Sequence, residues 1–323
     1  MAAPGIRIDV WDVGQGDCSV LTLPDGSLFV IDVGPRDSPF VPWIASRPHL
    51  RIACVALTHN DADHCGALTP LLAVTTGRLR KIRALVEPQR TQKQVVTLFR
   101  RAFEMHNSGL LDFGRLEAPA ELWDDPAEGT TLDVAFPEMP EIETAPSANA
   151  SSAVIRLRSR SQTLAVWPGD NHLKTVADKI AGQNPHFMVG PHHGHPQDLK
   201  KAGAAAQMDR IAPQQVLLSL GTDNSYNHPS PRYVKIAVSR QSRVTCTQLT
   251  RQCDRHRAPQ RRPILDGSSL LGLLPNPKGT PCRGAIRFTL SDGELIPDEW
   301  QAEHDKRVER LQRAMCQPST KDI

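Results

Sequence analysis

Four side chains that can bind a metal lie within six residues, directly after a short apolar run. The run spans residues 52–57, the length of one buried strand, and His59, Asp61, Asp63 and His64 follow it. Side chains alternate along a strand, so only a loop at the strand's end lets all four converge. Two imidazoles and two carboxylates packed this closely favour a cation among them, because it offsets their repulsion. The pattern therefore predicts a metal site where this strand ends.

Short apolar segments separated by turn residues continue along the chain. The glycine-bearing loop 12–17 joins two strands without opening a helix, so a dinucleotide-binding interpretation of it fails. Strands are expected at 6–10, 19–23, 28–33, 82–86, 131–136, 154–157, 163–167, 186–189, 216–220, 243–250 and 284–290, and helices at 68–74, 92–105, 173–181 and 300–315. Strands that end in metal-type loops in both halves indicate an α/β fold, an αββα sandwich of two packed sheets with helices outside.

Composition narrows the class of protein. Charged residues make up 23% and apolar ones 39% of the 323 residues, which describes a soluble globular chain of one or two domains. The sequence shows no leader and no apolar stretch near the roughly 20 residues that cross a bilayer, so we expect a cytoplasmic protein with no membrane partner. Seven cysteines, an odd number, favour reduced thiols over a disulfide framework.

The net charge of +3 conceals an uneven distribution. Residues 78–101 contain eight Lys or Arg and one acid, residues 251–262 contain five arginines, and residues 117–143 contain nine acids and no base. Runs of this kind are usually solvated faces of helices or loops, and a nucleic-acid footprint is the alternative. The charge pattern alone leaves both interpretations open.

The metal motif fits a known pattern. It resembles the HxHxDH signature of the metallo-β-lactamase superfamily, with Asp61 in place of the second histidine. Further motifs resemble, in the same order, those of the ComEC-type branch, named for the nuclease-like domain of bacterial DNA-uptake channels. They lie at residues 12–17, 31–34, 168–170, 192–194 and 227–229. The likeness covers about residues 6–250 and 284–295, here as a stand-alone soluble protein.

The resemblance implies two divalent metal ions at the open edge of the sandwich. Seven side chains would hold them: His59, Asp61, Asp63, His64, Asp170, His192 and His193. The first two would bind one metal and the next two the other, while the Asp170 carboxylate would bridge both. One of the two adjacent histidines, His192 or His193, would complete the shell of the second metal, and the other would meet a substrate oxygen.

The expected metal depends on one difference between this chain and the superfamily pattern. Many superfamily members place a third histidine on the first metal, whereas this chain has Asn149 in the matching region 148–152, as the ComEC-type branch does. Oxygen ligands favour manganese or magnesium over zinc. Asp17 and Asp32 are expected to support the metal loop without binding metal themselves.

The implied activity is hydrolysis of phosphodiester bonds in nucleic acid, with DNA as the expected substrate, by a metal-activated hydroxide. Asp63, His193 and His228 are the expected catalytic side chains. Substrate contacts are expected from Arg80, Lys81, Arg83, Asn149, Tyr226 and His228. The alternatives are a metallo-hydrolase of a small ester, lactam, thioester or nucleotide, and a non-catalytic binding module. A protein partner in a larger system is a further expectation.

The last eighty residues depart from this regularity. We expect residues 1–242 to form the metallo-β-lactamase-like domain and residues 243–323 to complete it with two paired strands and a capping helix. An insertion at about 250–282 carries polar residues and arginines. Cys246, Cys253, His256 and Cys282 are expected to close one tetrahedral, structural zinc site there, and unrelated thiols are the alternative.

Overall fold

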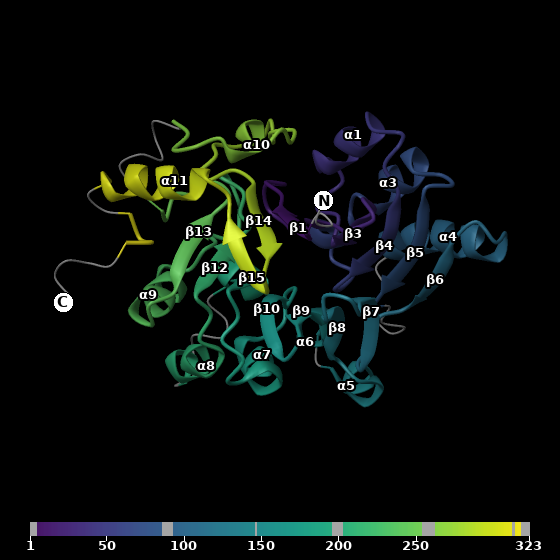
Figure 1. Cartoon of the computed structure of the whole chain (residues 1–323), viewed down its shortest axis with the longest axis horizontal. Coiled ribbons are helices and arrows are strands. Elements are labelled where there is room, and N and C mark those ends of the chain that lie inside the picture. The colour runs from purple at the N-terminus through teal and green to yellow at the C-terminus, as the bar shows by residue number, and fades with distance from the viewer. Residues whose placement is uncertain are drawn as a thin grey trace.

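Two β-sheets pack face to face, and helices cover the outer face of each (Figure 1). The computed structural model describes residues 5–85, 93–145, 147–195, 203–253, 262–311 and 314–317. The expected αββα sandwich is therefore confirmed. Within the described residues, no helix is both long and apolar enough to cross a membrane.

The first sheet has eight strands in the order β15-β14-β1-β2-β3-β4-β5-β6. Its strands are β1 (Arg7–Val10), β2 (Ser19–Thr22), β3 (Leu28–Ile31), β4 (Ile52–Leu57), β5 (Leu79–Ala84), β6 (Asp112–Arg115), β14 (Ile286–Ser291) and β15 (Glu294–Pro297). β3 to β6 run parallel, so their carboxyl ends meet at one edge. The outer face packs on α1 (Phe40–Ala45), α3 (Leu68–Val74) and α4 (Lys93–Asn107) through Trp43, Leu71 and Phe99.

The second sheet has seven strands in the order β13-β12-β11-β10-β9-β8-β7. They are β7 (Ala120–Asp125), β8 (Thr130–Phe136), β9 (Val154–Ser159), β10 (Gln162–Trp167), β11 (Phe187–Val189), β12 (Gln215–Leu218) and β13 (Arg243–Cys246). β10 to β13 run parallel, which again gathers carboxyl ends at one edge. Its outer face packs on α7 (Leu173–Ile180), α8 (Ala204–Ile211) and α9 (Pro231–Ser239).

The core between the sheets is built from the inward-facing side chains of both. Ile8 and Phe29 from the first sheet and Leu157 and Phe187 from the second belong to one buried apolar cluster. The ring of Phe187 stacks on that of Phe288 in β14, with centroids 4.7 Å apart. This contact is one of those that hold the two sheets face to face.

The C-terminal strands correct one expectation. The predicted pairing of 243–250 with 284–290 is wrong: β13 lies beside β12 in the second sheet, and β14 lies between β1 and β15 in the first. The two segments meet only near the bridge between Gln248 and Pro281. β13 is an edge strand of the second sheet, whereas β14 is an inner strand of the first, where Arg287 of β14 pairs with Asp9 of β1 at 2.5 Å.

Short helices complete the chain. They are α2 (Ala62–Cys65), α5 (Met139–Thr144), α6 (Ala148–Ser151), α10 (Gly267–Leu270) and the 3₁₀ turn η1 (Pro191–Gly194). The capping helix expected over 300–315 is the shorter α11 (Trp300–Glu309).

Candidate metal centre

The predicted ligands come from four segments that end at the same edge of the sandwich. His59 follows β4, and α2 carries Asp63 and His64. Asp170 follows β10, and η1 follows β11. The parallel strands therefore deliver all of these residues to one place, because their carboxyl ends coincide.

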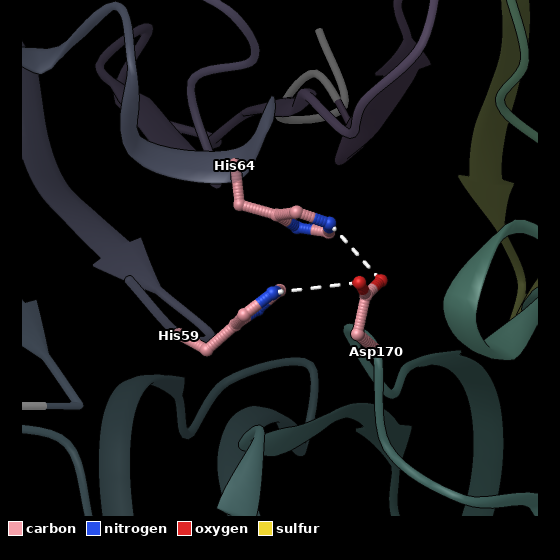
Figure 2. A group of neighbouring side chains, drawn as sticks. All are labelled: His59, His64 and Asp170. Carbon is pink, nitrogen blue, oxygen red and sulfur yellow. Dashed lines mark ion pairs between the residues drawn. The ribbon is translucent and has the colours of Figure 1, made fainter. Parts of the chain in front are cut away.

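Asp170 lies at the centre of the cluster. Its Oδ2 atom is 3.6 Å from Nε2 of His59, and its Oδ1 atom is 3.1 Å from Nε2 of His64. Figure 2 shows both imidazoles pointing at this carboxylate from the opposite sheet. One carboxylate thus faces two histidines with two different oxygens, which is the geometry of a bridging ligand.

The adjacent histidines of η1 repeat this division. Nε2 of His192 is 3.6 Å from Oδ2 of Asp170, whereas Nε2 of His193 is 3.6 Å from Oδ1 and 3.3 Å from Oδ2 of Asp63. Both residues have left-handed backbone, with φ of 47° and 51°, which turns successive side chains to the two sides of the carboxylate. The structure thus points both histidines at the cluster, as expected of a site where one binds metal and the other meets the substrate; which of them binds metal stays a prediction.

The seven side chains form two matched groups. Oδ2 of Asp170 belongs with His59 and His192, and Asp61 lies 3.7 Å from Nε2 of His59. Oδ1 belongs with Asp63, His64 and His193, as described above. Each group offers two imidazoles and two carboxylate oxygens. The side chains of Asp61 and Asp63 are 42% and 28% exposed, so the centre opens towards solvent on their side.

The buried polar atoms fit a cation. Nε2 of His59, Nε2 of His64 and Oδ1 of Asp170 are buried without a well-aligned hydrogen bond, although the last two atoms lie 3.1 Å apart. Leaving three such atoms unpaired in one place is costly unless another group satisfies them. Three sets with mutually close ligand atoms occur here: His59 with His64 and Asp170, Asp63 with His64 and His193, and Asp17 with Asp32 and His64.

Two further carboxylates lie behind the histidines, as expected for supporting residues. Asp32 is 2.8 Å from Nδ1 of His64 and accepts hydrogen bonds from the backbone N–H and the hydroxyl of Thr58. Asp17 lies 3.7 Å from Nδ1 of His193. A carboxylate on the far nitrogen fixes the ring's tautomer and direction, so that Nε2 faces the centre.

The glycine loop 12–17 holds the metal loop by its backbone. The N–H of Asp17 donates to the carbonyl of Asp63 at 3.2 Å. A Cβ on Gly16, whose φ is +136°, would lie 2.2 Å from that same carbonyl oxygen. The motif therefore needs glycine at this position for close approach to the chain that carries Asp63.

The electrostatics favour ionised carboxylates at the centre. Burial opposes ionisation of Asp170, but His64, His193 and His59 outweigh it and hold the pKa of this carboxyl well below its usual range. Burial also works against a charged His193, yet Asp170 and Asp17 raise its pKa to about 9. Without a cation, a histidine therefore carries positive charge that a metal would replace.

His228 lies beside this centre, and the nitrogens of its ring make no hydrogen bonds. The residue is buried. Its ring lies 5.7 Å from that of His192 and 6.0 Å from that of His193. Burial, and then the nearby His193 and His192, lower its pKa to about 3, so the imidazole is neutral at pH 7.

The loop that carries His228 is fixed and ends in an exposed aromatic. Asn224 accepts the backbone N–H of His228 and donates to its carbonyl at 2.8 and 3.0 Å. Tyr226, with its ring 5.7 Å from that of His228, is 66% exposed. Asn149 lies on the other side, with Nδ2 3.4 Å from Nε2 of His192. The structure thus brings these three predicted substrate-binding residues to the centre.

The three predicted basic residues are placed differently. Arg80 and Lys81 are exposed at the start of β5, where the register pairs Leu79 with Ile52 and Lys81 with Cys54, at the end of β4 remote from the metal loop. Arg83 is paired with Asp112 at 2.7 Å. The structure does not bring them to the metal centre, and their role in substrate binding stays a prediction.

The sequence interpretation missed two contributors. His195 stacks on His192 with ring centroids 4.4 Å apart, although it lies one residue beyond the recognised motif. The Thr58 hydroxyl links Asp32 to the ring of His59 at 2.7 and 3.2 Å. Thr58 could have been found as the polar residue that ends the buried strand. Nothing in the sequence indicates that the ring of His195 stacks on that of His192.

This fold, with histidine and carboxylate groups gathered at its loop edge, defines a metallo-hydrolase. A family model described as the metallo-beta-lactamase superfamily matches residues 11–199, more than half of the chain. The protein belongs to this superfamily. No curated protein matches the chain.

Solved structures with similar folds are distant in sequence. The metallo hydrolase Igni18 of Ignicoccus hospitalis is 17% identical with a TM-score of 0.47, and the match covers 74% of this chain and 94% of that one. A long form RNase Z from yeast is 8% identical with a TM-score of 0.43, covering 68% of this chain and 38% of that one. A metallo-beta-lactamase from Staphylococcus aureus is 13% identical with a TM-score of 0.34, covering 65% and 51%.

Proposed function

We propose that the protein is a two-metal phosphodiesterase that hydrolyses nucleic acid, a member of the ComEC-type branch. The observation that carries the proposal is the division of Asp170, each of whose oxygens faces two histidines. A single bridging carboxylate between two matched ligand groups suits a pair of cations.

His59, Asp61, His192 and Asp170 would hold one metal, and Asp63, His64, His193 and Asp170 the other. Two divalent cations there would lower the pKa of a water and stabilise the attacking and leaving oxygens of an in-line displacement at phosphorus. Carboxylates supply half of each group, and such oxygen ligands suit manganese or magnesium better than zinc.

His228 would act on the substrate as a hydrogen-bond donor. Its pKa of about 3 keeps the ring neutral, so it is poorly suited to protonating a leaving group. A neutral imidazole still carries one N–H, and neither nitrogen of this buried ring is engaged elsewhere. A phosphate oxygen reaching the centre would satisfy it.

The surroundings favour an extended, charged substrate over a small one. Exposed Tyr226 offers a flat face at the rim beside His228, suited to a nucleobase. Gln252 donates to Asn227 of the same loop at 3.3 Å, so exposed Arg251, the residue before Gln252, lies close in the chain to a residue that contacts this loop. The ComEC-type motifs supply the expectation of DNA; fold alone would not indicate the substrate.

An activity screen tests the proposal. Purified protein is incubated with single- and double-stranded DNA and RNA in manganese, magnesium or zinc, beside a panel of small esters, lactams, thioesters and nucleotides. We expect nucleic-acid cleavage with manganese above zinc, abolished by Asp63→Ala and by His64→Ala. Asp124→Ala, an exposed carboxylate on β7, is the matched control and should retain activity.

Two outcomes would contradict the proposal. Wild-type turnover by Asp63→Ala or His64→Ala would remove the mechanism. Hydrolysis confined to the small-molecule panel would remove the nucleic-acid substrate while leaving the metallo-hydrolase.

A further inference from the structure

Four cysteines from four separate segments line one small cavity away from the metal centre. Cys246 ends β13, Cys253 lies in the turn that follows, Cys282 precedes β14, and Cys316 lies in the segment 314–317. The cavity measures about 10 Å³, and its other lining side chains are apolar, among them Val234, Leu249, Ile264 and Leu311. None of these four cysteines forms a disulfide in the structure.

Main-chain hydrogen bonds impose this convergence. The N–H of Arg283 donates to the carbonyl of Cys246 at 3.0 Å, which sets Cys282 beside the end of β13. The N–H of Met315 donates to the carbonyl of Cys253 at 3.2 Å, which brings in Cys316. The backbone thus determines that these thiols share one cavity.

We propose that Cys246, Cys253, Cys282 and Cys316 bind one structural zinc ion. Four thiolates form a soft, closed ligand set of the kind that selects zinc, in contrast to the nitrogen and oxygen atoms of the active site. The apolar walls leave no place for a water or substrate ligand, so the role is structural. The fourth ligand expected from sequence, His256, lies outside the described residues, and Cys316 takes that place.

Binding would draw the thiols inward. Among the described residues, the groups whose ligand atoms already lie within 4.8 Å of one another are those of the active site. A cysteine sulfur moves readily by rotation about one bond. The ion would then join β13, the turn after it, the segment before β14 and segment 314–317.

Metal analysis of the full chain tests the site. Protein purified under reducing conditions is treated with a mild chelator that strips the active-site metals, and the remaining zinc is counted. One zinc per chain should stay bound. Cobalt substituted for it should show a thiolate-to-cobalt charge-transfer band, which the sulfur-free active-site ligands cannot produce. Absence of both the retained zinc and the band overturns the site.

Variants identify the ligands. Cys246→Ser and Cys316→Ser should lose the retained zinc and weaken the cobalt band, while Cys54→Ser, a buried cysteine of β4 outside the cavity, should keep both. If Cys316→Ser keeps the zinc and His256→Gln loses it, the assignment of Cys316 is wrong. The wild-type cobalt spectrum decides the existence of the site even if a variant fails to fold, and it does so independently of nuclease activity.

Discussion

Two consecutive residues decide how the metal centre is shared. His192 and His193 both have left-handed backbone, and this conformation sends their rings to different oxygens of Asp170. Each such residue costs about 1 kcal/mol relative to ordinary helical backbone. In return, each oxygen of Asp170 faces a pair of histidines, and each metal of the proposed pair would receive an equal ligand set.

Tyr226 should contribute to substrate affinity and not to the chemical step. Its exposed ring offers a stacking surface beside His228, and stacking on one base is worth roughly 1–3 kcal/mol. We expect Tyr226→Ala to weaken binding of a single-stranded oligonucleotide about tenfold with little change in kcat, and Tyr226→Phe to bind normally. Fluorescence anisotropy measures the affinity. A loss of kcat in Tyr226→Phe would contradict a stacking role.

Phe103 of α4 provides the matched control for this experiment. It is also an exposed aromatic, at 46%, and its ring packs against Phe113, in the adjoining β6. Phe103→Ala should leave oligonucleotide affinity unchanged. An equal loss in both alanine variants would show that the effect is not local to the centre.

Asp12 should make stability depend on pH. Burial raises the pKa of its carboxyl to about 7, and only Oδ1 has partners, Gly14 N–H and Gln248 Nε2. A raised pKa means that the folded state keeps a proton that the unfolded chain releases near pH 4. This contribution is complete below that pH and is lost as the pH rises to about 7.

Asp12→Asn cannot ionise and isolates the effect. Between pH 5 and 8, in chelator, the wild-type free energy of unfolding should fall by about 3 kcal/mol relative to this variant. Urea unfolding at the two pH values measures the difference. Parallel pH dependence of the two proteins would show that Asp12 is ionised throughout.

Among the elements, the glycine loop 12–17 sets the position of the metal loop. Gly16→Ala would place a methyl group 2.2 Å from the Asp63 carbonyl, so the variant should lose both stability and metal affinity. Gly26→Ala is the control, because its φ is also positive, at +78°, but nothing lies within 4 Å. The control should cost only about 1 kcal/mol. Urea unfolding and metal titration compare the two variants. Equal losses of stability and metal affinity would mean that the close contact with the Asp63 carbonyl is unimportant.

Sequence patterns predicted the parts of this site that depend on strand order. β4, β10 and β11 are short apolar runs followed by polar residues, and parallel strands bring such ends together. The destinations of β13 and β14 could not be predicted, because each is a short apolar strand that either sheet could accept. The contact of both His192 and His193 with Asp170 depends on their backbone dihedral angles, which the sequence pattern does not predict.

Across the whole molecule, we expect positive charge near the metal centre to affect oligonucleotide binding more than positive charge elsewhere on the chain. Arg251 is exposed next to the 221–229 loop, whereas Arg80 lies at the start of β5, about four residues from the strand end that faces the metal loop. We expect Arg251→Glu to weaken oligonucleotide binding severalfold and to lower the slope of log affinity against log salt by about 1. Filter binding across a salt series measures both.

Arg80→Glu is the matched control and should change affinity less. Greater loss from Arg80→Glu than from Arg251→Glu would place the binding path along β5, as the basic run 78–101 suggests, and would move the substrate away from Tyr226.

We infer that residues 1–242 and 243–323 fold as a single unit, because β13 completes one sheet and β14 and β15 complete the other. β1, the first strand, has β14 as one of its two neighbours, and nearly the whole chain separates them. During synthesis, the ligands of the metal centre therefore leave the ribosome well before the sheet that supports them can close. The nascent protein therefore passes through an interval in which its histidines and carboxylates are exposed but not yet arranged, and the proposed metals would find the complete ligand set only after β14 has been synthesised.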